Sequence, residues 1–198
     1  ANGSYTVSVI GKNSANVWQD TGEATVSRTW TVQAGQRQLI INEVLARNNT
    51  AVPQPDESFP DLVELYNAGG VTVDLKGLGI TDDPLDPYRF EFPAGTSLAP
   101  GQYLVLIARE QTTNTGIHLG FALDQRGDAI YLFDRAGGSG LLDSVMFGPQ
   151  IADRSVARRA QGTWGLAIPT FGGPNQIHPT GNPHFLKINE WGADGQTA

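Results

Sequence analysis

The 198-residue sequence contains no cysteine and only three histidines. The absence of cysteine excludes a disulfide scaffold, a catalytic thiol and any zinc site built on thiolates. Three imidazoles also provide few general bases and few nitrogen ligands for a metal. No Gly-x-Ser-x-Gly turn is present to carry a serine nucleophile. The sequence therefore argues against the commonest forms of nucleophilic and metal-assisted catalysis.

Positive charge and long apolar runs are also scarce. The chain has 13 Lys and Arg residues against 20 Asp and Glu residues, for a formal net charge of −7 at pH 7. Proteins that bind nucleic acids neutralise phosphates with Lys and Arg, so this balance argues against nucleic acid as a partner. No run of about 18 apolar residues occurs, and the sequence predicts no membrane-spanning helix.

The sequence is instead rich in short alternating patterns that are typical of β-strands. Apolar and β-branched residues alternate over many short stretches, and Gly and Pro, with 24 and 12 copies, separate these stretches. No segment keeps apolar residues at helical spacing. We predict an all-β, antiparallel sandwich or barrel, with residues 103–108 as a central strand because they are apolar on both faces. The predicted strands cover residues 5–9, 25–32, 39–46, 62–66, 71–75, 78–81, 89–92, 103–108, 129–134 and 141–147.

One short segment occurs twice and suggests the domain organisation. Residues Leu39–Asn48 and Leu186–Gly195 share Leu, Ile, Asn, Glu and Ala at matching positions, which indicates the start of a second repeat. Residues 169–183 are rich in Pro, Gly, Asn and Thr, as linkers often are. The predicted parts are residues 1–38, the last hairpin of a preceding repeat; residues 39–175, a complete sandwich; and residues 176–198, a linker with a truncated second repeat.

The central part resembles a known family through its whole length. The segments that carry the resemblance are Ile41–Val44, Asp61–Asn67, Val73–Leu78, Pro100–Leu106, Gly127–Asp134, Asp143–Val145, Asp153–Arg159 and Thr170–Asn175. In this order they resemble the lamin tail domain, and this resemblance implies an immunoglobulin-like β-sandwich. The insert Asp82–Pro87 is similar to bacterial members, and residues 5–14 are similar to a fibronectin-III or related immunoglobulin-like repeat.

Three aspartates form the candidate metal site. Asp82, Asp83 and Asp86 lie close together in the sequence, and carboxylate oxygens are the ligands that Ca²⁺ prefers. Asp before Pro is also an ordinary turn former, and the favoured interpretation is a solvated turn. Ca²⁺ is accordingly the one possible cofactor, and it would stiffen this loop.

The candidate binding residues are the arginines Arg154, Arg158 and Arg159. If they lie on a strand, Arg154 and Arg158 share one face and Arg159 points the other way, which makes a small positive patch. Glu43 either accepts hydrogen bonds from turn amides or pairs with an arginine such as Arg158 or Arg159, which would join the first strand to the last. The ion pair is the favoured interpretation.

These observations and the resemblance predict a non-catalytic binding, spacing or anchoring module of a modular secreted or cell-surface bacterial protein. Its expected partners are neighbouring β-sandwich domains of the same chain and a cell-surface component or polysaccharide. Two alternatives remain: an accessory substrate-binding domain of an extracellular hydrolase, such as a nuclease or phosphatase, and an adhesion module stiffened by Ca²⁺. The acidic residues between positions 56 and 91 mark the surface where a partner or cation is expected.

Overall fold

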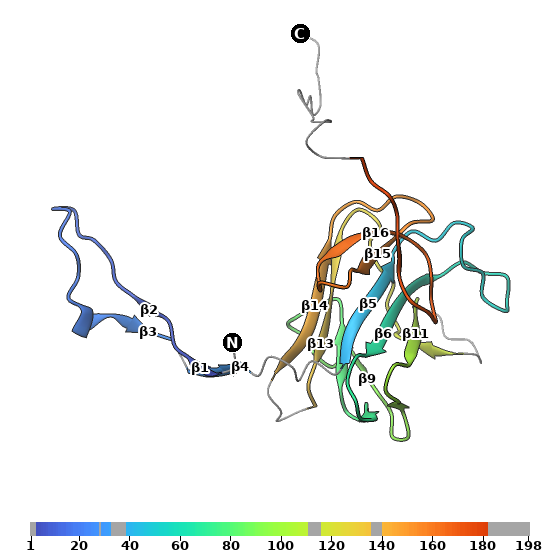
Figure 1. Cartoon of the computed structure of the whole chain (residues 1–198), viewed down its shortest axis with the longest axis horizontal. Helices are drawn as coiled ribbons and strands as arrows, with labels where there is room; N and C mark the ends of the chain where they lie inside the picture. The colour runs from blue at the N-terminus through green and yellow to red at the C-terminus, as the bar shows by residue number, and fades with distance from the viewer. Residues whose placement is uncertain (1–2, 28, 33–38, 111–115, 136–139, 182–198) are drawn as a thin grey trace, which may run out of the picture. The chain divides into compact units, whose positions relative to one another are not determined.

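The computed structural model describes residues 3–27, 29–32, 39–110, 116–135 and 140–181 (Figure 1). The chain divides into two compact units, Ala1–Gln38 and Leu39–Ala198. The predicted start of a second repeat at residues 186–195 lies outside the described residues. No helix among the described residues is long and apolar enough to cross a membrane.

The first unit is a narrow antiparallel ribbon. Strand β1 (Gly3–Tyr5) pairs with β4 (Trp30–Val32), and β2 (Ser8–Val9) pairs with β3 (Thr25–Val26). A 3₁₀ turn, η1 (Thr21–Glu23), lies in the connection between β2 and β3. None of the side chains described in this unit is buried, so two strands alone enclose no core.

The second unit is a two-layer β-sandwich, and Figure 1 shows β13 and β14 facing the layer that contains β5, β6 and β11. One sheet has the strand order β12-β11-β6-β5-β15-β16-β17, the other the order β14-β13-β8-β9, and β10 and β7 form a separate pair. The strands of the larger sheet are β5 (Leu39–Leu45), β6 (Asp61–Asn67), β11 (Tyr103–Ala108), β12 (Ile117–His118), β15 (Ser155–Arg158), β16 (Trp164–Ile168) and β17 (Gln176–Ile177). The remaining strands are β7 (Val73–Asp74), β8 (Gly79–Thr81), β9 (Phe90–Glu91), β10 (Ser97–Leu98), β13 (Asp128–Phe133) and β14 (Leu141–Phe147).

The main hydrophobic core lies between the two sheets. It takes alternate residues from each layer, since side chains along a strand point to opposite faces. Its fully buried members include Ile41, Leu65, Leu106, Ile130 and Leu132. A smaller cluster of Leu45, Leu62 and Ile107 packs on the outer face of the larger sheet, where Val52 and Phe171 cover it. The larger sheet is therefore covered on both faces along part of its length.

The all-β antiparallel prediction is confirmed, with one parallel pairing, β11 with β12, among the described strands. Two further details differ. Strand β11 is not central: it lies second from the edge, beside the two-residue strand β12, and β5 occupies the middle of the sheet. The second face of β11 is apolar because Ile107 and Val105 on that face pack in the smaller cluster. Strand β17 falls inside the predicted linker, where Ala167 and Ile168 pair with Ile177 and Gln176. The sandwich thus extends beyond residue 175.

Candidate functional site

A bulge in β5 positions the first polar residues of the site. The pairing of β5 with β6 shifts register between Ile41 and Glu43, so Asn42 is the extra residue on the β5 side. Ile41, Asn42 and Glu43 are all buried, although they are consecutive in a strand. The Ile-Asn-Glu sequence therefore places two polar side chains inside the protein.

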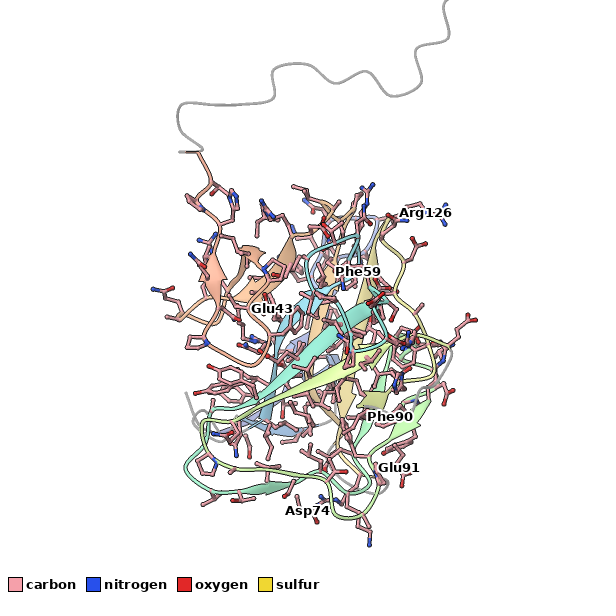
Figure 2. All side chains as sticks on the ribbon, turned by 90° about the vertical axis from the view of Figure 1, so that its right-hand side faces the viewer. Glu43, Phe59, Asp74, Phe90, Glu91 and Arg126 are labelled. Carbon is pink, nitrogen blue, oxygen red and sulfur yellow. The ribbon has the colours of Figure 1, made fainter. Side chains whose placement is uncertain are left out.

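Glu43, labelled in Figure 2, is fully buried. It accepts hydrogen bonds from two later segments of the chain. Its Oε1 accepts from the Ser155 hydroxyl at 2.5 Å, and its Oε2 accepts from the Thr170 backbone N–H at 3.1 Å and from the Thr170 hydroxyl at 3.2 Å. Burial raises the pKa of Glu43, and the Ser155 and Thr170 hydrogen bonds limit that rise. Of the two alternatives for this residue, the structure shows hydrogen bonding to a turn amide.

Glu64 lies on β6 opposite Glu43 and is also fully buried. One carboxylate oxygen accepts from the Asn42 side-chain amide at 2.7 Å, and the other accepts from the Gly172 backbone N–H at 2.5 Å. Burial raises the pKa of Glu64 to about 7; the hydrogen bonds from Gly172 and Asn42 oppose this rise, and the charge of Glu43 adds to it. Glu64 therefore changes its protonation state near neutral pH.

Asn42 and Asn175 bind each other through their side-chain amides. Asn42 Nδ2 donates to Asn175 Oδ1 at 2.9 Å, and Asn175 Nδ2 donates to Asn42 Oδ1 at 3.0 Å and to the Arg158 carbonyl at 2.8 Å. Thr170, Gly172 and Asn175 belong to the same closing segment of the chain. These hydrogen bonds hold that segment against the outer face of β5 and β6.

Arg158 pairs with Asp143 rather than with Glu43. Its Nη2 lies 2.5 Å from Asp143 Oδ2, and its side chain is only 9% exposed against 4% for that of Asp143. Arg158 Nε also donates to the Ile41 carbonyl at 2.8 Å, while Asp143 accepts from the Ile41 N–H at 2.9 Å. The guanidinium stacks 4.5 Å from the Trp164 ring centre. The expected ion pair from Glu43 to Arg158 or Arg159 is thus replaced by a pair that clamps β5 to β14.

We call this hydrogen-bonded network the polar seam. Its members are Asn42, Glu43, Glu64, Asp143, Ser155, Arg158, Thr170, Gly172 and Asn175. Both glutamates are buried and accept their hydrogen bonds from other members of the seam. Acid–base catalysis requires a carboxyl group within reach of a substrate, and these two carboxyl groups are instead used to hold strands and the closing segment together.

A groove lies beside the seam on the outer face of the larger sheet. Ile40, Tyr66 and Tyr103 are cross-strand neighbours on β5, β6 and β11. The Tyr66 and Tyr103 rings stack with centroids 4.6 Å apart. We call this depression of about 390 Å³ the tyrosine groove; its residues include Ile40, Tyr66, Tyr103, Arg159, Pro174 and Asn175. Burial, Tyr66 and Glu64 together raise the pKa of Tyr103, so its hydroxyl stays protonated at neutral pH.

The three predicted binding arginines do not form one patch. Arg158 is held in the seam, and Arg154 donates to the Asp153 carbonyl at 2.7 Å just before β15 begins. Arg159 is exposed and contributes to the tyrosine groove. Arg158 also lines the groove, but it is largely buried and paired with Asp143, so Arg159 is the exposed arginine of the set at the groove.

The three predicted metal ligands are not gathered around one point. Asp82 Oδ1 accepts from Arg89 Nη1 at 2.6 Å, whereas Asp83 Oδ1 accepts from the Leu85 backbone N–H at 2.9 Å as an Asx turn. Asp86 donates its own backbone N–H to the Asp83 carbonyl. Within the described ranges, no group of three or more His, Cys, Asp or Glu side chains is arranged to hold a metal ion. We call residues 82–86 the acidic loop.

The acidic residues between positions 56 and 91 do not form a single surface either. In Figure 2, Asp74 and Glu91 lie at one end of the sandwich, whereas Phe59, which neighbours Asp56 and Glu57 in the sequence, lies toward the other end, where Arg126 is labelled. Glu64 is in the interior. The expected acidic patch is therefore divided between the two ends and the core.

The family model described as Lamin Tail Domain matches residues 32–148 of this chain. The chain belongs to the lamin tail domain family. Comparison with curated proteins and with solved structures finds no match. The lamin tail domain is immunoglobulin-like, so the predicted immunoglobulin-like sandwich is confirmed, and folds of this kind are generally non-catalytic.

The lamin tail sandwich extends past the matched range. Ser155, Arg158, Thr170 and Asn175 all lie after residue 148, yet they complete the polar seam on β5 and β6. All four lie in segments that resemble the family, but of these only Arg158 is predicted from the sequence as a site residue. The pairing of Tyr66 with Tyr103 is not predicted from the sequence. The available signal is that Tyr66 ends one apolar strand pattern and Tyr103 begins another. Only the register between β6 and β11 brings their rings together.

Proposed function

We propose that this chain is a non-catalytic binding and spacing module of a secreted or cell-surface bacterial protein. In this role, the lamin tail sandwich lies among neighbouring β-sandwich domains of the same chain. It offers a rigid surface to a cell-surface component such as a polysaccharide, while the adjoining segments determine its reach.

One observation carries this proposal. The carboxyl groups of Glu43 and Glu64, whose pKa values burial raises, are fully buried and accept hydrogen bonds from the Thr170 and Gly172 backbone amides. A substrate could reach them only if the closing segment left the sheet. What this arrangement supports is a stiff scaffold with a surface groove.

The test combines sedimentation and turnover. The full chain is mixed with purified bacterial cell envelopes, and we expect saturable cosedimentation. The same preparation is then incubated with phosphomonoester, phosphodiester and glycoside substrates, and we expect no product above the level of a Glu64→Gln control. Turnover that Glu64→Gln abolishes would overturn the proposal, as would a chain that stays in the supernatant with every envelope preparation.

A further inference from the structure

The tyrosine groove is lined by two stacked aromatic rings whose hydroxyl groups are available to a ligand. Ile41, Leu65 and Leu104 contribute to the core, so their neighbours Ile40, Tyr66 and Tyr103 point to the opposite, outer face of the sheet. Both tyrosines are partly exposed. Neither phenolic hydroxyl hydrogen-bonds another residue in the described part of the chain, so both can donate to and accept from a ligand.

Tyr103 also lies beside a part of β11 that β12 does not pair with. Each ring places one face against the other, and Ile40 is the next neighbour of Tyr66 across β5. On the side of β11 away from β6, β12 pairs with Leu106 and Ile107, so Tyr103 has no cross-strand neighbour there among the described residues. Because Tyr103 is partly exposed and lines the groove, an apolar ligand surface, such as the C–H face of a sugar ring, can pack against its ring.

Arg159 adds a cation to the rim of this groove. Its guanidinium lies against Gly165 on β16, where an added Cβ would come within 2.5 Å of Arg159 Nε. It forms no ion pair with another described residue, whereas Arg158 is neutralised by Asp143. The groove therefore has a free positive charge, although the whole chain carries −7. This local reversal of sign favours a ligand with an isolated negative group.

From these features we infer that the tyrosine groove binds an acidic glycan, with a uronate carboxylate on Arg159 and a sugar ring on Tyr103. The inference rests on the proposed function and names the ligand class of that surface. The Tyr66 and Tyr103 hydroxyls would bind sugar hydroxyls, and Arg159 would form charge-assisted hydrogen bonds to the carboxylate.

Single-stranded nucleic acid also combines rings and negative charge, but the structure favours the glycan. A polyphosphate strand requires several cations along its path, and this groove provides one unpaired arginine in an acidic chain. A short acidic oligosaccharide needs only one of its carboxylates to meet that arginine, and its other sugars can extend away from the groove. It also has the hydroxyls that match the two phenols.

The test is a calorimetric titration of the full chain with oligosaccharides of hyaluronan, alginate and polygalacturonate, each compared with its methyl-esterified form. We expect at least one acidic glycan to bind about tenfold more tightly than its ester, since charge-assisted hydrogen bonds are lost on esterification. Arg159→Gln should weaken binding of the acid about tenfold and leave the ester unaffected. The matched control, Arg154→Gln, removes one positive charge outside the groove and should change neither the affinity for the acid nor the affinity for its ester.

A second variant separates the ring from the charge. Tyr103→Ala should weaken binding of the acid and of the ester by a similar factor, about fivefold, because it removes the packing surface and not the cation. Equal binding of acids and esters, an unaffected Arg159→Gln variant or tighter binding of a single-stranded DNA oligomer would each overturn the inference. The inference would also be overturned if none of the three acidic glycans bound. The proposed function is tested by turnover and by cosedimentation with envelopes, so it can hold even if the glycan titrations overturn this inference.

Discussion

The polar seam and the acidic loop are both rich in carboxyl groups, but those of the seam are buried and those of the loop are largely exposed to solvent. In the seam, Glu43 and Glu64 are fully buried, and donors from later segments of the chain satisfy them. In the acidic loop, Asp83 caps a local turn and Asp82 meets Arg89, whose side chain is 41% exposed. The seam therefore joins distant parts of the fold, whereas the loop organises only itself.

This difference shows how burial decides what a carboxylate does. A buried carboxylate loses its hydration and is tolerated only if donors from the protein replace the water, so each donor becomes a tie between segments. An exposed carboxylate keeps its water, and its hydrogen bonds add little to stability. The number of acidic residues in a stretch is a poor guide to where the fold depends on them.

The largest predicted effect compares one arginine–aspartate pair from each region. Arg158→Ala should lower the free energy of unfolding by about 3–5 kcal/mol, because it leaves Asp143 buried without its cation. Arg89→Ala should lower it by about 1 kcal/mol or less, since its pair with Asp82 is solvated. Urea unfolding followed by far-ultraviolet circular dichroism measures both. Equal losses in the two variants would contradict the comparison.

The second prediction concerns Glu43. Glu43→Ala should destabilise the sandwich by about 2–4 kcal/mol, because the Ser155 hydroxyl and the Thr170 N–H lose their acceptor inside the protein. Asp86→Ala, which truncates an exposed carboxylate in the acidic loop, should stay within about 0.5 kcal/mol of the parent. The same urea titration measures both variants. Hydrogen exchange at the Thr170 amide gives a local readout, and unchanged protection there in Glu43→Ala would count against the seam.

The third prediction is a pH dependence that comes from the seam. Burial raises the pKa of Glu64 from 4.5 to about 7, so the folded state holds this proton more tightly than the unfolded state. The resulting stability is fully present below pH 4.5 and is lost as the pH rises through 7. We expect the free energy of unfolding to fall by about 2 kcal/mol between pH 5 and pH 8. Denaturant titrations across this range measure the effect.

Two variants assign that pH dependence. Glu64→Gln should flatten the profile between pH 6 and pH 8. Asp61→Asn should flatten it only at lower pH, because burial raises the pKa of Asp61 to about 6. A steep loss of stability above pH 6 that persists in Glu64→Gln would mean that another group carries the effect.

Most of the architecture could be predicted from local patterns. Strands β5, β6, β11, β13 and β14 show alternation or apolar runs that the sequence reveals directly. Strands β12 and β17 contain two residues each, which is too short for a period-two signal. Their positions are set by pairing with the strands that precede them, β11 and β16, and so the last strand of the sheet falls inside the predicted linker.

The candidate site could be predicted only in part. Glu43 was recognised as a joining residue, but its partner is a backbone amide 127 positions later, and a backbone amide has no signature in the sequence. The Tyr66–Tyr103 stack depends on the register between β6 and β11. Nor does the spacing of Arg158 and Arg159 show which guanidinium the fold neutralises. Each of these details is a long-range consequence of packing.

The smallest predicted effect concerns calcium at the acidic loop. Because Asp82 is paired with Arg89 and Asp83 caps its own turn, their oxygens are already engaged with protein groups and do not converge. Ca²⁺ usually takes six to eight oxygen ligands, so the loop as built has no cage for it. A thermal melt should therefore shift by less than about 1 °C in millimolar Ca²⁺, since a ligand stabilises a fold only if it binds the folded state. A larger rise that Asp86→Asn abolishes, but Asp74→Asn at a separate site does not, would show that the loop rearranges to bind the ion. In that case the exposed carboxylates, like the buried ones, would join parts of the fold once their water is replaced.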